Sequence, residues 1–157
     1  MKVLVSRVTR AEIEVRGERI ASIPRGLAVY VGFCRGDGAQ QVYEIAKKLI
    51  HLRIFEDERQ KMRFSAAEIN GHILCVPNFT LCADTRSGRR PSFEGALAPD
   101  RARLLFRDLL ALLQTELPCA AGIFGADMRI TQELDGPVNL VLESRSRGGE
   151  PQKKGRK

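Results

Sequence analysis

Apolar and polar residues alternate along several stretches of the chain, and this period-two pattern predicts a fold rich in β-strands. The pattern begins at Val3, Val5 and Val8 and continues at Ile13 and Val15. A turn is expected next, at 16–18. Further strands are expected at 26–33, 52–55, 72–81, 119–123, 126–134 and 138–143. Pro77 lies inside one of them, and because proline cannot donate to a sheet, that strand should be distorted or end there.

Two other segments have the spacing of amphipathic helices. Between 39 and 52 the apolar positions recur every three or four residues, while Lys47 and Lys48 occupy the polar side. A second helix is expected to begin near Pro99 and to place Leu105, Leu109 and Leu113 on one face. Strands together with two separate helices indicate an α/β fold, a single compact β-rich domain with a mixed or mostly antiparallel sheet.

The composition is that of one ordinary globular domain, with 157 residues, 43% hydrophobic and 29% charged. No apolar run is long enough to span a bilayer. The first residues, 1–7, lack the apolar core of a secretion signal. We therefore expect a cytoplasmic protein without a membrane partner.

The four cysteines do not form a Cys-x-x-Cys pair, and we expect reduced, structural thiols. The two histidines, His51 and His72, have no partner three or four residues away, so the sequence predicts no metal site. A thiol hydrolase that uses Cys75 or Cys82 with His72 is an alternative, although burial would oppose ionisation of such a thiol.

Positive charge gathers at the end of the chain. After Ser144 there are six basic residues and one acidic residue, a charge of +5 out of the total of +7, which leaves +2 for the rest. The segment 145–157 is predicted to be a basic, disordered tail, and 1–144 to be the folded domain. The tail is interpreted equally well as a solubilising extension or as an electrostatic contact for RNA.

Taken singly, the polar motifs are weak signals. The basic loop that contains Arg86, Arg89 and Arg90 is usually a solvated turn, although three arginines can also hold the phosphates of a nucleic acid. The segment 135–137, Asp-Gly-Pro, predicts a tight turn between two strands. The segment 78–80, Asn-Phe-Thr, would be core with a satisfied hydroxyl.

Taken together and in order, these motifs resemble a known family. The matching segments are Ser-Arg-Val at 6–8, Leu-Arg-Ile-Phe-Glu-Asp at 52–57, Phe-Thr-Leu at 79–81, Gly-Arg-Arg-Pro-Ser-Phe at 88–93, Phe-Gly-Ala-Asp-Met at 124–128 and Asp-Gly-Pro-Val at 135–138. They resemble the bacterial and eukaryotic D-aminoacyl-tRNA deacylases over roughly residues 1–144.

This resemblance implies a homodimer without a cofactor, whose active site lies at the subunit interface. One subunit supplies a Ser-Gln-Phe-Thr-Leu motif, here 77–81, and its partner supplies a cis Gly-Pro motif, here Gly136 and Pro137. Arg7 would hold that motif inward, and Met128 belongs to the same substrate-binding set. The implied activity is hydrolysis of the ester of D-aminoacyl-tRNA, and of glycine mischarged on tRNA, because the Gly-Pro carbonyls would clash with an L side chain.

The chain departs from the family motif at its start, where Pro77 and Asn78 replace Ser and Gln. Asn139 also stands where the family usually has Thr. Thr80 is expected to be a hydrogen-bonding group rather than a covalent nucleophile, because no base lies near it in the sequence. Two alternatives stay open: a deacylase of relaxed chirality that accepts some L-aminoacyl-tRNA, and a non-catalytic tRNA-binding relative.

Overall fold

The computed structural model describes residues 1–144, and its framework is a six-stranded sheet. Five strands follow one another in the order β2-β1-β3-β6-β7, and the sixth, β8, pairs with β1. Their bounds are β1 (Lys2–Val15), β2 (Glu18–Ile23), β3 (Gly26–Gly32), β6 (His72–Pro77), β7 (Cys119–Ala121) and β8 (Arg129–Glu143). β1 is antiparallel to β2, β3 and β8, whereas β3, β6 and β7 are parallel to one another. The expected mixed sheet is confirmed.

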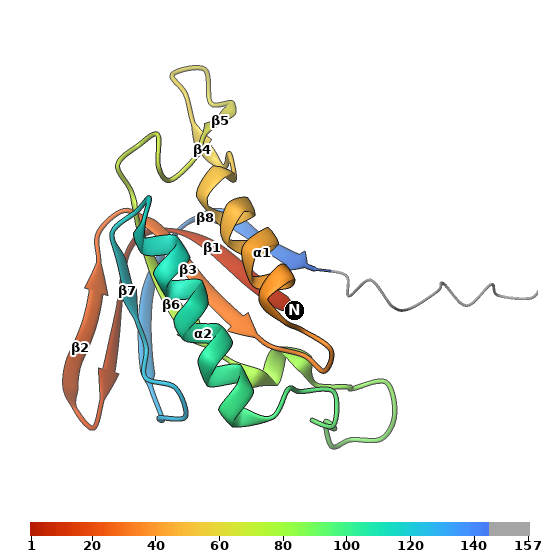
Figure 1. Ribbon diagram of the computed structural model, residues 1–157. Coiled ribbons are helices and arrows are strands. Elements are labelled where there is room, and N and C mark those ends of the chain that lie inside the picture. Colours follow the sequence, from red (N-terminus) through yellow and green to blue (C-terminus); the bar gives the residue numbers. More distant parts are fainter. Residues whose placement is uncertain (145–157) are drawn as a thin grey trace, which may run out of the picture.

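Two helices pack against one face of this sheet (Figure 1). They are α1 (Ala39–His51), close to the predicted 39–52, and α2 (Pro99–Gln114), which begins at the predicted Pro99. Alternate residues of the parallel strands face opposite ways, so Val29 and Cys75 belong to the core under the helices, while Ala28 and Leu74 belong to a smaller core on the other face. Burial on both faces explains why β3 and β6 have nearly continuous apolar sequences.

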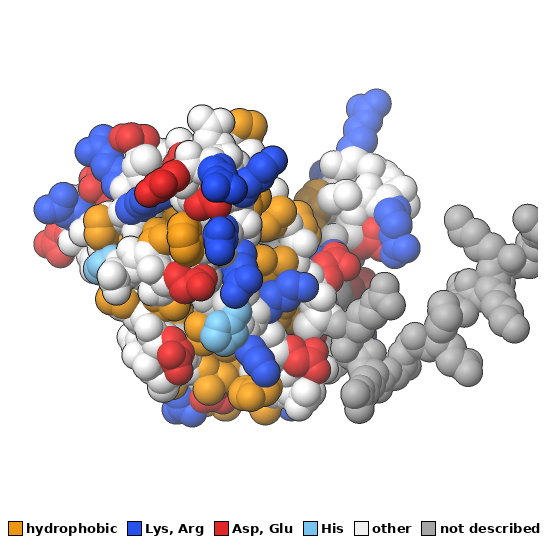
Figure 2. Space-filling model, turned by 90° about the horizontal axis from the view of Figure 1, so that it is seen from above, with side chains coloured by type: hydrophobic (Ala, Val, Ile, Leu, Met, Phe, Trp, Pro, Cys, Tyr) orange, Lys and Arg blue, Asp and Glu red, His pale blue; other side chains and the backbone are white. Residues whose placement is uncertain are grey.

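A short hairpin projects from the end of α1, at the top of Figure 1. It consists of β4 (Phe55–Glu56) and β5 (Met62–Phe64), where the sequence predicted a strand at 52–55 followed by a polar turn. In the view from this side, basic and acidic side chains are interspersed, with hydrophobic side chains between them (Figure 2). This agrees with the small charge of residues 1–144. No helix in the described part of the chain has both the length and the apolar character needed to cross a membrane.

The structure corrects three element predictions. The strand expected at 72–81 ends at Pro77, and a short 3-10 helix, η1 (Phe79–Cys82), replaces its second half. The strands expected at 126–134 and 138–143 are one continuous strand, β8, so 135–137 is not a tight turn. The strand pairing instead shifts register between Ser6 and Val8 of β1, which accommodates the Gly-Pro segment as an irregularity within the strand.

Candidate active site

The predicted reaction centre lies where β6 ends and η1 begins. Pro77 is the last residue of β6, and the following residue donates a hydrogen bond from Asn78 N to the carbonyl of Val31 in β3 (2.7 Å). Gly32 lies directly beneath η1, because a Cβ added there would be 2.9 Å from Asn78 O and 2.9 Å from the Cβ of Leu81. A larger residue at position 32 would therefore displace the helix. The sheet fixes the position of η1 through a backbone contact.

Asn78 and Thr80 form a local hydrogen-bonded pair at the start of η1. The Asn78 Oδ1 atom accepts hydrogen bonds from the hydroxyl of Thr80 (2.5 Å) and from its backbone N–H (3.2 Å). Since the Thr80 hydroxyl donates its proton to an amide oxygen, which is no general base, the arrangement does not activate it as a nucleophile. Because the hydroxyl proton is used in this bond, the lone pairs of the Thr80 hydroxyl remain free to accept a hydrogen bond. Thr80 is exposed, so a ligand can reach them.

An apolar pocket of about 430 Å³ opens beside this pair. Phe79 lines it and is 58% exposed, and its ring meets that of Phe93 edge to face, with the ring centroids 5.2 Å apart. Residues after β3, residues at the start of α2, and Phe124 complete the wall. The lining contains no acidic residue, lysine or histidine. Such a pocket can bind a flat apolar group but cannot perform acid–base chemistry on it.

The second predicted motif lies in β8. The Gly136–Pro137 peptide bond is cis, as the resemblance implied, and both residues are exposed. The preceding residue is held by Arg7, whose Nε donates to the carbonyl of Asp135 (2.8 Å) and lies 3.3 Å from its carboxylate. Arg7 is itself buried and also donates to the carbonyl of Ile54 (2.7 Å) and to Glu56 (3.3 Å). It thus connects the Gly-Pro segment to the base of the hairpin.

Within one chain these two motifs lie at opposite ends of β3. Arg7 pairs with Leu27 near the beginning of that strand, whereas η1 contacts Gly32 at its end. Five residues of extended strand separate them, about 17 Å at roughly 3.3 Å per residue. Gly136 and Pro137 do not line the pocket beside η1. A single chain therefore does not bring the two halves of the predicted site together.

Met128 approaches the same glycine, Gly122, as the reaction-centre residue Pro77 does. A Cβ added at Gly122 would be 2.6 Å from the Met128 sulfur and 3.4 Å from Pro77 Cδ, so both side chains approach the same glycine. The Met128 side chain is half-buried and packs on the smaller core. Met128 and Pro77 thus both lie against the backbone that follows β7 (Cys119–Ala121).

The three predicted arginines share one exposed loop but differ in their partners. Arg86 makes a bidentate pair with Asp84, and its hydrogen bonds hold the pKa of that carboxyl well below its usual range. This pairing neutralises much of its charge. Arg89 and Arg90 are exposed, with no side-chain partner in the described residues.

The cysteines correct the expectation of four reduced thiols. Cys34 and Cys82 form a disulfide, and only Cys75 and Cys119 are free among residues 1–144. Burial raises the pKa of the Cys75 thiol well above its usual range, and burial raises that of Cys119 to about 11. In the disulfide form Cys82 is bound to Cys34, and Cys75 is buried, so neither thiol offered as a partner of His72 is available as a hydrolytic nucleophile.

Two features of the site were missed by sequence reasoning. Phe124 belonged to a matched segment and Phe93 ended another, yet nothing in the sequence indicated that both line one pocket. The disulfide joins residues 48 positions apart, so no spacing pattern could suggest it. Among the described residues no group of three or more His, Cys, Asp or Glu side chains could hold a metal ion.

Comparison with known proteins gives a consistent result. The family model described as D-Tyr-tRNA(Tyr) deacylase matches residues 4–143. A D-aminoacyl-tRNA deacylase of Dichelobacter nodosus is 46% identical over 140 residues, covering 88% of this chain and 97% of its own, and one of Paracoccus denitrificans is 44% identical over 148 residues, covering 94% and 99%. Among solved structures, a c-Myc DNA unwinding element binding protein has a TM-score of 0.87 at 37% identity, covering 92% of this chain and 99% of its own. A probable eukaryotic D-amino acid tRNA deacylase, at 18% identity and a TM-score of 0.76, shares the fold and covers 90% of this chain and 97% of its own.

Proposed function

Because the chain belongs to the D-Tyr-tRNA(Tyr) deacylase family, we propose that it hydrolyses the ester that joins a D-amino acid to the terminal ribose of tRNA. The enzyme is a D-aminoacyl-tRNA deacylase, an ester hydrolase. Its relatives of that name are 46% and 44% identical to it over nearly all of their own length. The observation that carries the proposal for the site is the Asn78–Thr80 pair at the mouth of an apolar pocket.

Catalysis rests on positioning and on backbone hydrogen bonds rather than on a covalent intermediate. The first N–H groups of a helix have no intrahelical acceptor, so the N–H of Phe79 can donate to the oxyanion that develops on the ester carbonyl. The Thr80 hydroxyl, turned by its bond to Asn78, accepts a hydrogen bond from the α-ammonium group of the substrate. An aminoacyl ester is already activated, so a neighbouring ribose hydroxyl can assist water without a protein base.

The apolar pocket receives the base of the terminal adenosine. Every aminoacyl-tRNA has this adenosine, whereas the amino-acid side chains differ, so a single built pocket best fits the common part. Its phenylalanine rings provide surfaces on which a base can stack. The side chain of the amino acid then points away from the protein, which is consistent with action on several D-amino acids.

The complete site forms between two copies of the chain. β8 pairs only with β1, so its other edge has no strand partner within residues 1–144. The strand carries two exposed apolar side chains, Leu134 (48%) and Val141 (68%), on either side of the exposed Pro137 in sequence. A second copy that covers this strand would bury them and could present its Gly136–Pro137 segment to Thr80 across the interface.

The Gly-Pro segment of the partner would select by exclusion. Its carbonyl groups would occupy the space that an L side chain needs, while a D side chain or the hydrogen of glycine would fit. Glycine mischarged on tRNA should therefore also be released. Arg7 holds the preceding residue by two contacts, which keeps the segment in one orientation.

Relaxed chirality is a second candidate, favoured by Pro77. Proline lacks the hydroxyl and the N–H that the usual serine provides at this position, so one polar contact near the substrate is lost. Some L-aminoacyl-tRNA would then be hydrolysed at a lower rate. A non-catalytic tRNA-binding relative would hydrolyse none.

One experiment separates these possibilities. The purified protein is incubated with D-tyrosyl-, L-tyrosyl- and glycyl-tRNA, and release of each amino acid is measured against a Thr80→Ala variant. Rapid loss of the D and glycyl esters alone supports strict selection, and added loss of the L ester supports relaxed chirality. No loss of any ester above the Thr80→Ala variant would contradict the proposal.

A further inference from the structure

The disulfide between Cys34 and Cys82 lies at the reaction centre rather than at a remote point of the fold. Cys82 is the last residue of η1, the helix that begins with Phe79 and Thr80. Its partner, Cys34, follows β3 by two residues. The bond therefore joins the end of the reaction-centre helix to the chain that leaves the strand beneath it.

The Cys34 side of the bond is firmly anchored. The backbone N–H of Cys34 donates to Asp37 Oδ2 (2.6 Å), and Cys34 forms a β-bridge with Ala96. The carboxylate of Asp37 is buried and paired with the amino group of Met1 (2.6 Å). The next residue, Arg35, donates its N–H to Gly95 O (2.7 Å). Cys34 thus belongs to a network that does not depend on η1.

The Cys82 side has fewer attachments. The start of η1 is tied to β3 by the bond from Asn78 to Val31, whereas the hydrogen bond from Ala83 N to Thr80 O stays within the helix turn. Leu81 packs on Gly32, and beyond the helix Asp84 exchanges two backbone hydrogen bonds with Ser92 in the following loop (2.8 and 2.9 Å). The disulfide is the covalent link between the end of η1 and the sheet. Breaking it would leave the end of η1 held by non-covalent contacts alone, the packing of Leu81 on Gly32 and the pairing of Asp84 with Ser92 beyond the helix.

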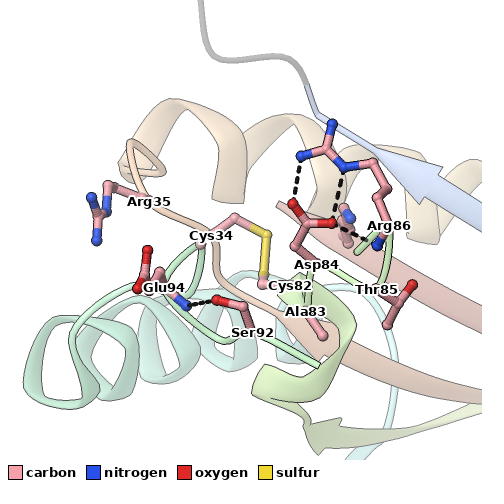
Figure 3. Close-up of a pocket in the computed structure, with 11 residues that line it drawn as sticks. Cys34, Arg35, Cys82, Ala83, Asp84, Thr85, Arg86, Ser92 and Glu94 are labelled. Atoms are coloured by element: carbon pink, nitrogen blue, oxygen red, sulfur yellow. Dashed lines mark hydrogen bonds and ion pairs between the residues drawn. A yellow bond between two sulfur atoms is a disulfide. The ribbon is translucent and has the colours of Figure 1, made fainter. Parts of the chain in front are cut away.

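Small molecules can reach this disulfide. Both cysteines line an open pocket of about 800 Å³, shown in Figure 3, where the two sulfur atoms lie between Arg35 and Glu94 on one side and the Asp84–Arg86 pair on the other. The charged side chains of the lining are three basic and two acidic, because Lys2 also belongs to it. The two free cysteines do not line this pocket, and burial raises the pKa of each.

We propose that Cys34 and Cys82 form a thiol–disulfide exchange site for anionic low-molecular-weight disulfides of the glutathione type, and that its oxidation fixes η1 in the catalytic position. The proposal rests on the placement of the reaction centre at Phe79 and Thr80. The positive balance of the pocket favours an anionic reagent, and the more exposed Cys34 is the residue that such a reagent meets first.

The exchange is balanced in atoms and electrons. The thiolate of Cys34 attacks one sulfur of glutathione disulfide, a protein–glutathione bond forms, and one glutathione thiolate leaves. The thiolate of Cys82 then attacks the Cys34 sulfur and releases the second glutathione. The two protein thiols are oxidised by two electrons, glutathione disulfide is reduced to two thiols, and the two protons pass to the departing thiolates.

The test measures structure and activity on the same samples of full-length protein. The protein is equilibrated at a series of ratios of glutathione to glutathione disulfide, free thiols are trapped by alkylation and located by mass spectrometry, and hydrogen exchange of the amides at 79–83 is recorded. We expect the amides to exchange more slowly in the oxidised form. We expect kcat on D-tyrosyl-tRNA to fall between about threefold and 100-fold on reduction, with a smaller change in KM, because the misplaced group acts in the reaction step.

Two variants make the result specific. A Cys34→Ser, Cys82→Ser double variant should keep the kcat and the fast exchange of the reduced protein at every ratio, while Cys119→Ser should respond as the parent does. Equal kcat in oxidised and reduced parent, equal exchange at 79–83, or thiols at 34 and 82 that stay free in glutathione disulfide would each overturn the proposal. If the protein lacks deacylase activity in both states, the proposed function fails, whereas the thiol mapping and the exchange still decide whether the site exists and holds η1.

Discussion

Removal of the Arg7 side chain should destabilise the protein strongly. The Arg7→Ala change deletes the hydrogen bonds to the carbonyls of Ile54 (2.7 Å) and Asp135 (2.8 Å), together with an ion pair to Glu56 at 3.3 Å. Because the Arg7 side chain is only 7% exposed, water cannot fully replace these contacts. Both carbonyls would lose a charged donor.

The magnitude follows from the individual contacts. A hydrogen bond to a charged group contributes about 1.5–3 kcal/mol, and two of them dominate here. The carboxylates of Glu56 and Asp135 are 40% and 33% exposed, so solvent screening reduces the contribution of the ion pairs. We therefore expect a loss of roughly 3–5 kcal/mol in the free energy of unfolding, out of a total of about 5–15 kcal/mol.

Urea unfolding followed by circular dichroism measures this loss, with all proteins at one concentration because the unfolding of the proposed dimer would depend on concentration. Arg10 is the matched control: it lies in the same strand and pairs with Glu133, but its side chain is 75% exposed. Arg10→Ala should cost at most about 1 kcal/mol. An Arg7→Ala variant that loses no more than Arg10→Ala would refute the assigned role, and Arg7→Lys, which keeps the charge but loses the planar fork, should be intermediate.

Three further outcomes are expected. Gly32→Ala should reduce kcat at least about tenfold, because the new Cβ would lie 2.9 Å from Asn78 O and displace η1. The rate is measured by release of D-tyrosine from D-tyrosyl-tRNA, and an unchanged rate would contradict this packing. The carboxyl of Asp84 should stay ionised at about pH 3.9, where an ordinary aspartate is half protonated, because the hydrogen bonds from Arg86 lower its pKa. The Asp84–Arg86 ion pair should therefore persist until the pH falls well below about 3.9. An Asp84 carboxyl that titrates by NMR like an ordinary aspartate would disprove the pairing. Deletion of 145–157 should weaken tRNA binding and flatten its dependence on salt if the tail contacts phosphates, whereas equal affinity and slope would make it a solubilising extension.

The sequence predicted the fold well where local patterns determine structure. The helical spacing of Ile45 and Leu49 lies within α1, and the turn at 16–18 joins β1 to β2, with Arg16 and Gly17 at positive φ. Pro77 ends its strand, in agreement with its missing N–H donor. These features depend on residues close together in the chain.

Features that depend on distant residues were not predictable in this way. The pairing of β8 along β1 carries the chain through 135–137 without a turn, although those three residues have the composition of one. The bond between Cys34 and Cys82 exists because β3 and η1 meet at Gly32, a contact created by the fold. The Asn78–Thr80 pair is local, but its position beside a pocket lined by Phe93 and other distant residues is not.

A site shared between subunits can be tested most directly by mixing two variants. Thr80→Ala subunits should be inactive, whereas Gly136→Ala subunits, in which a new Cβ would lie 2.7 Å from Val138 N, should lose the chiral filter and hydrolyse L-tyrosyl-tRNA. After unfolding and refolding together, with Thr80→Ala in about tenfold excess, nearly every intact Thr80 would face an intact partner Gly-Pro segment. We predict that L-tyrosyl-tRNA hydrolysis per Gly136→Ala subunit then falls to about a tenth, as random pairing in a twofold dimer requires. If L-tyrosyl-tRNA hydrolysis instead stays proportional to the Gly136→Ala subunits at every mixing ratio, the filter acts within its own chain and the shared site is contradicted.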